Sequence, residues 1–73
     1  MISGETLRLL RILKGIKQET IAKKLGISQP AYCKMERCQK VNPVKYRQVI
    51  EALDCTKEEL QEVVRITGIR KSA

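Results

Sequence analysis

Two short amphipathic segments joined by a tight turn at Gly26 constrain the fold of this chain more than any other feature. Gly26 tolerates the left-handed backbone that a tight turn between two helices needs. The second segment starts again at once, with Ser28 as an N-cap and Pro30 in the first turn, where a missing N–H costs little. Ala22 is small enough for two helices to cross closely at its position. This spacing predicts a helix-turn-helix unit over residues 18–37.

A first helix is predicted before this unit. Ser3 is placed to cap its N-terminus, the helix is expected to run to about Lys14, and Gly15 is expected to end it. Apolar residues recur along this segment at helical spacing. The expected apolar stripe consists of Leu7, Leu9, Leu10, Ile12 and Leu13.

Two more helices are predicted after the helix-turn-helix unit. Asn42 and Pro43 form an N-cap and first-turn pair for a fourth helix. Thr56 and Glu59 have the spacing of a capping box, in which each side chain bonds the backbone N–H of the other residue. This pair is expected to open a fifth helix, and Gly68 is expected to end it.

The composition favours an all-α fold. The 73 residues include no Trp or Phe and only two Tyr, so the core must be built from Leu, Ile, Val, Ala and Met. Small β-sandwiches and barrels usually contain more aromatic and β-branched residues. We therefore predict one compact five-helix domain over residues 1–69, followed by a short tail at residues 70–73.

The charge is divided unevenly along the chain. The net charge is +7, but the stretch from Arg8 to Arg47 holds eleven basic and two acidic residues. From Gln48 to Val64 the balance reverses, with five acidic residues against one lysine. A basic body with an acidic back suggests a polyanionic partner that meets one side of the molecule. The alternative is an ordinary, highly charged surface without a specific partner.

Residues that catalysis and metal binding usually require are scarce. The chain contains no histidine, so neither a Ser-His nor a Cys-His nucleophile pair is possible, and it has no glycine-rich phosphate loop. Its three cysteines form no Cys-x-x-Cys pair, and a zinc site built from them would need a further ligand. No apolar run is long enough to span a membrane, and no signal peptide is recognisable. We expect no enzyme, metal, cofactor or membrane association, and we expect reduced thiols.

The sequence resembles the Cro/repressor-type (Xre-like, lambda-repressor-like) helix-turn-helix family. The likeness is carried by LRLLRILKGIKQETIAKKLGISQPAYCKMER and YRQVIEALDCTKEEL, and it covers roughly residues 5–64. The combination of Gln18, Ala22, Gly26-Ile27-Ser28 and Glu36 is quite specific. The resemblance implies a lambda-repressor-like five-helix domain that binds double-stranded operator DNA, usually as a dimer, with the third helix in the major groove.

The resemblance also implies two groups of DNA contacts. Gln29 matches a glutamine that reads an adenine, and Lys34 is placed to reach a guanine or a phosphate. The residues expected to face the bases are Ser28, Gln29, Pro30, Cys33 and Lys34. The residues expected to hold the DNA backbone are Lys17, Gln18, Arg37, Gln39, Lys40 and Lys45.

Glu36 is expected to have a structural role. A carboxylate near a helix C-terminus faces the negative end of the helix dipole, so it favours a cation nearby. The resemblance pairs Glu36 with Arg11 of the first helix, and this pair would brace the third helix. The alternative is an unpaired glutamate on the surface.

The chain also departs from the family pattern in four places. Pro30 replaces a residue that is usually polar, and Cys38 stands where a glycine commonly follows the third helix. Tyr32 is larger than the usual Ile or Val, and Lys17 occupies a position where a capping Ser or Thr is common. We expect these changes to leave the fold intact and to alter individual base contacts.

The expected function is that of a sequence-specific DNA-binding transcriptional regulator, a repressor acting as a homodimer without a small-molecule ligand. Its expected location is the cytoplasm of a bacterium or of a phage host, in association with the nucleoid. Two alternatives remain, the DNA-binding half of an antitoxin and a helix-turn-helix module that binds another protein. Ile66 and Ile69 either form the dimer face or pack against the first helix. Cys33 and Cys38 are either redox-sensitive or ordinary surface residues.

Overall fold

The computed structural model describes the backbone of residues 3–72 and the side chains of residues 3–66. Residues 3–72 form five helices and contain no strand, which confirms the predicted all-α class. The helices are α1 (Gly4–Leu13), α2 (Gln18–Leu25), α3 (Gln29–Arg37), α4 (Pro43–Leu53) and α5 (Lys57–Ser72). Within this part of the chain, no helix has both the length and the apolar character needed to cross a lipid bilayer.

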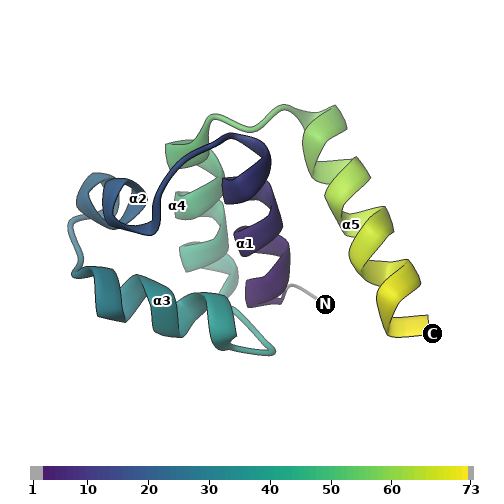
Figure 1. Cartoon of the computed structure of the whole chain (residues 1–73), viewed down its shortest axis with the longest axis horizontal. Helices are drawn as coiled ribbons and strands as arrows, with labels where there is room; N and C mark the ends of the chain where they lie inside the picture. The colour runs from purple at the N-terminus through teal and green to yellow at the C-terminus, as the bar shows by residue number, and fades with distance from the viewer. Residues whose placement is uncertain (1–2, 73) are drawn as a thin grey trace.

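Helix α1 is the centre of the fold, because α3, α4 and α5 all pack against it (Figure 1). Helix α2 lies against both α3 and α4 and completes the bundle. The fully buried leucines Leu7 and Leu10 project from α1 into the shared core. The other buried apolar side chains are Ile21, Ala22, Tyr32, Val41, Val49, Leu53 and Val63.

Side chains near the predicted helix starts satisfy backbone N–H groups that the helix itself leaves unbonded. Ser3 and Ser28 each accept a hydrogen bond from the backbone three residues on, and Asn42 accepts one from the backbone two residues on. Thr56 Oγ1 accepts from the Glu59 N–H at 3.1 Å, and the Glu59 carboxylate accepts from the Thr56 N–H at 2.9 Å. The three predicted N-caps and the capping box are therefore confirmed.

The predicted apolar stripe of α1 is wrong at its C-terminal end. Ile12 and Leu13 are 50% and 55% exposed, whereas Leu7 and Leu10 are fully buried. Each three-residue step falls about 60° short of a full helical turn, so Leu13 lies about 120° around the helix from Leu7. The last turn of α1 therefore directs these two side chains away from the core.

The prediction that Gly68 ends the last helix is also wrong, because α5 continues through it to Ser72. A glycine inside a helix costs only about 0.5–1 kcal/mol relative to alanine, so it ends a helix only where the chain must turn. The division into residues 1–69 and a tail at 70–73 stays a prediction. Ile69, offered as part of a dimer face, lies outside the side chains that the structure describes.

Candidate nucleic-acid interface

The turn between α2 and α3 fixes the angle of α3. Gly26 has φ +71° and ψ 27°, the left-handed conformation expected of it. The Ile27 N–H donates to the Ala22 carbonyl at 3.0 Å, which closes the end of α2. Ala22 is 2% exposed at the crossing, and Tyr32 of α3 is fully buried behind it. The helix-turn-helix unit therefore has the geometry that its sequence predicts.

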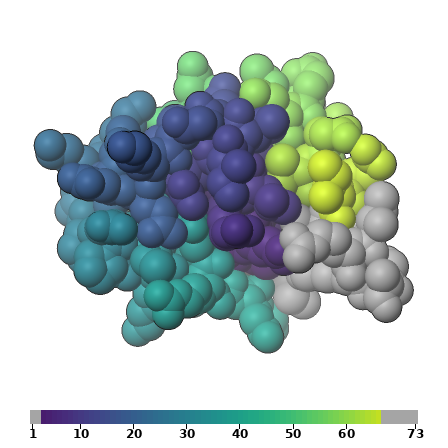
Figure 2. Space-filling model, viewed as in Figure 1, coloured from purple at the N-terminus to yellow at the C-terminus, as the bar shows by residue number. Residues whose placement is uncertain are grey.

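The opposite face of α3 is turned to the solvent. Ser28, Gln29, Pro30 and Lys34 are exposed, and Cys33 is half-buried. Positions three or four residues apart on a helix share a face, so Gln29, Pro30, Cys33 and Lys34 form one surface next to the Ser28 cap. Helices α2 and α3 together make up one end of the molecule, with α1 between them and α5 (Figure 2). The structure thus gathers all five side chains that were expected to face DNA bases.

Cations and amides continue this surface beyond the end of α3. Arg37, Gln39, Lys40 and Lys45 are all exposed. Lys40 and Lys45 line the same shallow hollow of about 210 Å³ as Lys34 of α3. Three ammonium groups from α3, the following loop and α4 therefore border one concave patch beside the N-terminus of α4. Both the positive charge and the helix N-terminus favour an anion there.

The expected pair of Arg11 and Glu36 is present as an ion pair between α1 and α3. Arg11 Nε donates to Glu36 Oε2 at 2.7 Å, and Arg11 Nη2 lies 3.3 Å from Glu36 Oε1. Gln18 Nε2 of α2 also donates to Glu36 Oε1, at 2.8 Å. The remaining Arg11 nitrogen, Nη1, donates to the Ile16 carbonyl at 2.9 Å. One buried carboxylate therefore joins α1, α2 and α3.

Burial and hydrogen bonding act on the pKa of Glu36 in opposite directions. Burial alone would raise it, but the bonds to the carboxylate, chiefly from Arg11, outweigh this effect and lower the pKa below its usual 4.5. Burial, reinforced by the nearby carboxylate, raises the pKa of Tyr32. By distance and angle, the buried Tyr32 hydroxyl forms no hydrogen bond with the described residues, although the Glu36 carboxylate is close enough to act on its pKa. Glu36 is thus held in its charged form and Tyr32 in its neutral form.

Gln18 connects this buried network to the outer face of α3. While its amide nitrogen is bonded to Glu36, its Oε1 lies 3.5 Å from Nε2 of Gln29, a long contact. A series of polar contacts therefore runs from Arg11 and Glu36 through Gln18 to Gln29, the first residue of α3. The predicted phosphate contact of Gln18 is untested, whereas its bond to Glu36 was not predicted.

The structure shows the local setting of three of the four departures from the family pattern. Lys17 is the N-cap of α2 but makes no side-chain capping bond, and Pro30 lies in the first turn of α3. Cys38 ends α3 in an extended conformation with φ −73° and ψ 138°, so no left-handed glycine is needed. Cys33 accepts a contact of 3.3 Å from Arg37 Nη2. Within the described residues, no three Cys, Asp or Glu side chains gather as a metal site.

One residue that positions α3 was missed by sequence reasoning. The N–H of Gly4, the first residue of α1, donates to the Cys38 carbonyl at 2.8 Å. A Cβ at Gly4 would lie 2.3 Å from the Met35 carbonyl oxygen and 2.5 Å from that of Glu36. The start of α1 therefore rests directly on the carbonyls at the end of α3. The available signal was a glycine straight after the Ser3 cap, where helices favour proline or an acidic residue.

The fold and this surface together define a class of protein, an all-α helix-turn-helix domain whose second motif helix faces outward among cations. The helix-turn-helix family model matches residues 7–60 of the chain. The chain therefore belongs to the Xre/lambda-repressor-like helix-turn-helix family, whose members are DNA-binding regulators and not enzymes, so the resemblance found in the sequence is confirmed. No curated protein and no solved structure matched it.

Proposed function

We propose that this chain is a sequence-specific transcriptional repressor that binds double-stranded operator DNA as a homodimer, with α3 in the major groove of each half-site. The observation that supports this most strongly is the outer face of α3. That face is exposed, carries an amide and an ammonium group, and belongs to a helix whose inner face is anchored by Tyr32 and Glu36. A major-groove probe needs both an exposed face and a fixed orientation.

In this proposal the outer face of α3 reads the bases. Gln29 can donate to N7 and accept from the N6 amine of one adenine, if its amide is presented edge-on to the base. Lys34, one and a half turns further along, can donate to O6 or N7 of a guanine. Ser28, Pro30 and Cys33 complete the surface that meets the base edges. The apolar ring of Pro30 suits a thymine methyl group better than a hydrogen-bonding edge.

A second group of residues would fix the protein on the sugar-phosphate backbone. Lys40 and Lys45 border the concave patch at the start of α4, and Arg37 lies at the end of α3. Lys17 and Gln18 stand at the start of α2, with Gln39 in the loop after α3. Such contacts supply affinity and register but little sequence preference. Because the partner is operator DNA, we propose that the protein works in the cytoplasm at a bacterial or phage chromosome.

Binding to random duplex DNA at two salt concentrations tests the electrostatic part of the proposal. The four cations among these backbone-contacting residues, if each neutralises one phosphate, predict that the affinity of one chain falls about a hundredfold between about 50 and 200 mM salt. Selection of bound sequences from a random pool then tests whether α3 reads bases. Affinity that does not fall with salt would refute DNA binding and favour a protein-interaction module. A steep salt dependence with no enriched sequence would refute operator reading.

A further inference from the structure

The hydroxyl of Tyr32 takes no part in the hydrogen bonding of the domain as it stands. Tyr32 is fully buried on the inner face of α3, and its hydroxyl is the one buried polar side-chain atom of the described residues that forms no hydrogen bond. Burial without a partner costs free energy, which a phenylalanine at this position would avoid. Such a hydroxyl points to an acceptor that becomes available in a second arrangement of its surroundings.

The carboxylate of Glu36 is the acceptor beside this hydroxyl. Tyr32 and Glu36 lie four residues apart on α3, a spacing that makes side chains neighbours on a helix, and both are buried. Burial raises the pKa of Tyr32 and the Glu36 carboxylate raises it further, whereas Arg11, the ion-pair partner of Glu36, lowers it. The hydroxyl therefore lies next to the ion pair without bonding to it.

The donors that satisfy Glu36 are unequal. Its Oε2 accepts from Arg11 Nε at 2.7 Å, while its Oε1 accepts from Gln18 Nε2 at 2.8 Å and lies 3.3 Å from Arg11 Nη2. Without Gln18, Oε1 would keep only the longest of these three contacts. Loss of a donor from a buried carboxylate oxygen is unfavourable, so a replacement donor would be favoured. The Tyr32 hydroxyl is suited to this exchange, because it can donate and has no other partner.

We propose that Tyr32 is a reserve donor to Glu36: when Gln18 turns outward to a DNA phosphate, the Tyr32 hydroxyl takes its place on Oε1. The proposal rests on the proposed function, in which Gln18 contacts the DNA backbone. In the free protein the Gln18 nitrogen is bonded to Glu36, and its Oε1, which contacts the exposed Gln29, cannot donate to a phosphate oxygen. The exchange frees this nitrogen while the ion pair with Arg11 stays intact. Tyr32 is thus a positioning residue that touches no DNA.

Unfolding in urea tests the exchange without DNA. In the wild type, Tyr32→Phe removes a hydroxyl that has no partner, so the urea midpoint should stay the same or rise. Gln18→Leu removes the competing donor, and the Tyr32 hydroxyl should then bond Glu36 in the free protein. In that background Tyr32→Phe should raise the equilibrium constant of unfolding about tenfold. A ring that only fills space would give the same effect in both backgrounds, because phenylalanine keeps the ring.

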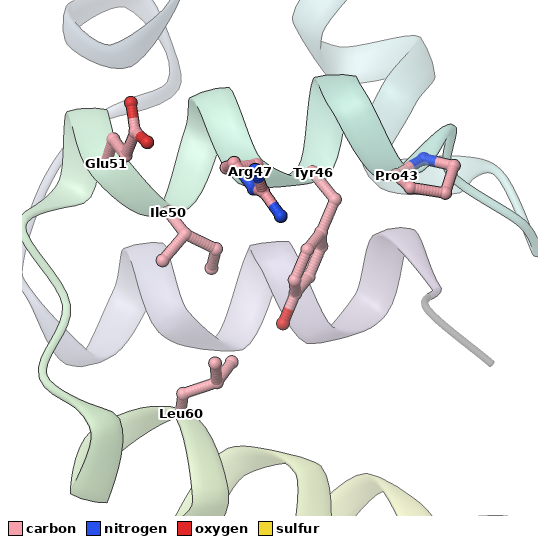
Figure 3. A pocket seen from close by; sticks show the side chains of 6 residues that line it. All are labelled: Pro43, Tyr46, Arg47, Ile50, Glu51 and Leu60. Atoms are coloured by element: carbon pink, nitrogen blue, oxygen red, sulfur yellow. The ribbon is translucent and has the colours of Figure 1, made fainter.

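Tyr46→Phe is the matched control for this comparison. The ring of Tyr46 projects from α4 towards α5 and borders a groove of about 630 Å³ (Figure 3), so Tyr46 belongs to a different part of the fold from Glu36. Distant sites change stability additively. Tyr46→Phe should therefore change the unfolding equilibrium by the same factor in the wild type and in Gln18→Leu.

Duplex binding tests the link between the exchange and DNA. Tyr32→Phe should lower the affinity for random and selected duplexes by the same factor, about tenfold, because the bound state then leaves Glu36 Oε1 without its replacement donor. In Gln18→Leu, which has no such phosphate contact, Tyr32→Phe should lower the affinity no further.

The outcomes separate this proposal from the proposed function. Equal effects of Tyr32→Phe on stability in the two backgrounds, or wild-type affinity in Tyr32→Phe, refute the donor exchange alone. A wild type that binds no duplex refutes the proposed function. Should Gln18→Leu fail to fold, the affinity of Tyr32→Phe relative to the wild type decides.

Discussion

Substitution of Gly4 by alanine should separate the stability of this fold from the accuracy of its DNA reading. The N-terminal turn of α1 meets the last turn of α3 there without room for a side chain. The added Cβ would lie 2.3 and 2.5 Å from two carbonyl oxygens and 2.6 Å from the Glu36 carbonyl carbon. These are backbone atoms, so no side-chain rotation can relieve the overlap. Either α1 or α3 must move.

The size of the movement follows from these distances. Real Cβ atoms keep at least 3.0 Å from such neighbours, so the closest contact must open by 0.7 Å or more. Overpacking of this kind costs about 1–3 kcal/mol. Loss of the bond from the Gly4 N–H to the Cys38 carbonyl, 2.8 Å long, adds about 0.5–1.5 kcal/mol. Alanine offsets about 0.4–1 kcal/mol by restricting the unfolded chain. We expect Gly4→Ala to reduce the free energy of unfolding by about 2 kcal/mol.

Gly15→Ala is the matched control for this experiment. Gly15 has φ +70° and no atom within 4 Å of an added Cβ, so alanine is strained there but collides with nothing. Its cost should be about 1–2 kcal/mol, similar to that of Gly4→Ala. Gly15 lies between α1 and α2, away from the end of α3. The two variants therefore lose comparable stability, but only Gly4→Ala displaces α3.

The assay combines urea unfolding with affinities for a duplex selected by the wild-type protein and for a random duplex. Gly4→Ala should lower the ratio of the two affinities about tenfold, since base contacts tolerate only about 0.5 Å of misplacement. Gly15→Ala should leave this ratio unchanged under conditions where it is folded. The reasoning is refuted if Gly4→Ala costs less than about 0.5 kcal/mol, or if both variants retain the same ratio.

Three further predictions concern the outer face of α3 and the support beneath it. Gln29→Ala should cost about 1–3 kcal/mol of binding free energy at one base position of the selected duplex. Lys40→Ala should weaken binding to selected and random duplexes alike and reduce the salt slope by about one. Identical behaviour of the two variants would contradict the division into reading and anchoring residues. Because the folded-state pKa of Glu36 is lowered, its charge adds stability that is present above about pH 4.5 and is lost as pH falls through the folded pKa. The difference in urea stability between wild type and Glu36→Gln, about 3 kcal/mol at pH 7, should therefore shrink at lower pH. Parallel pH curves for the two proteins would contradict this. We expect oxidant to leave the DNA affinity of the wild type and of a Cys33→Ser/Cys38→Ser protein equally unchanged. If the affinity of this variant still falls under oxidant, these thiols are not responsible for redox sensitivity.

Much of the fold was predictable because its signals are local. A cap or a turn depends on a few neighbouring residues, as at Ser28, Gly26 and the pair of Thr56 and Glu59. The outer face of α3 was predictable for a related reason, since helical periodicity fixes which side chains share a side. The family resemblance added the pairing of Arg11 with Glu36 across 25 residues, which spacing alone does not imply.

The features that sequence reasoning missed depend on contacts between distant segments. Leu13 has helical spacing from Leu10, but whether the last turn of α1 is covered depends on where its neighbours end. Gly68 resembles a helix end locally, yet α5 continues through it. Gly4 is constrained by the end of α3, more than 30 residues away in sequence. Local propensity carries no information about such approaches, so tertiary packing decides them.

The network around Glu36 addresses a physical difficulty of a reading helix with only nine residues. A helix of that length is unstable by itself, and under the proposed function its outer face must remain free for DNA. Its orientation must therefore come from the inner face and the two ends. Gln18 acts near the first end, Tyr32 in the middle, and Gly4 with Arg11 at the last end. A buried ion pair adds little net stability compared with apolar packing, but its directional bonds tolerate few orientations. We infer that Glu36 serves the orientation of α3 more than the stability of the domain.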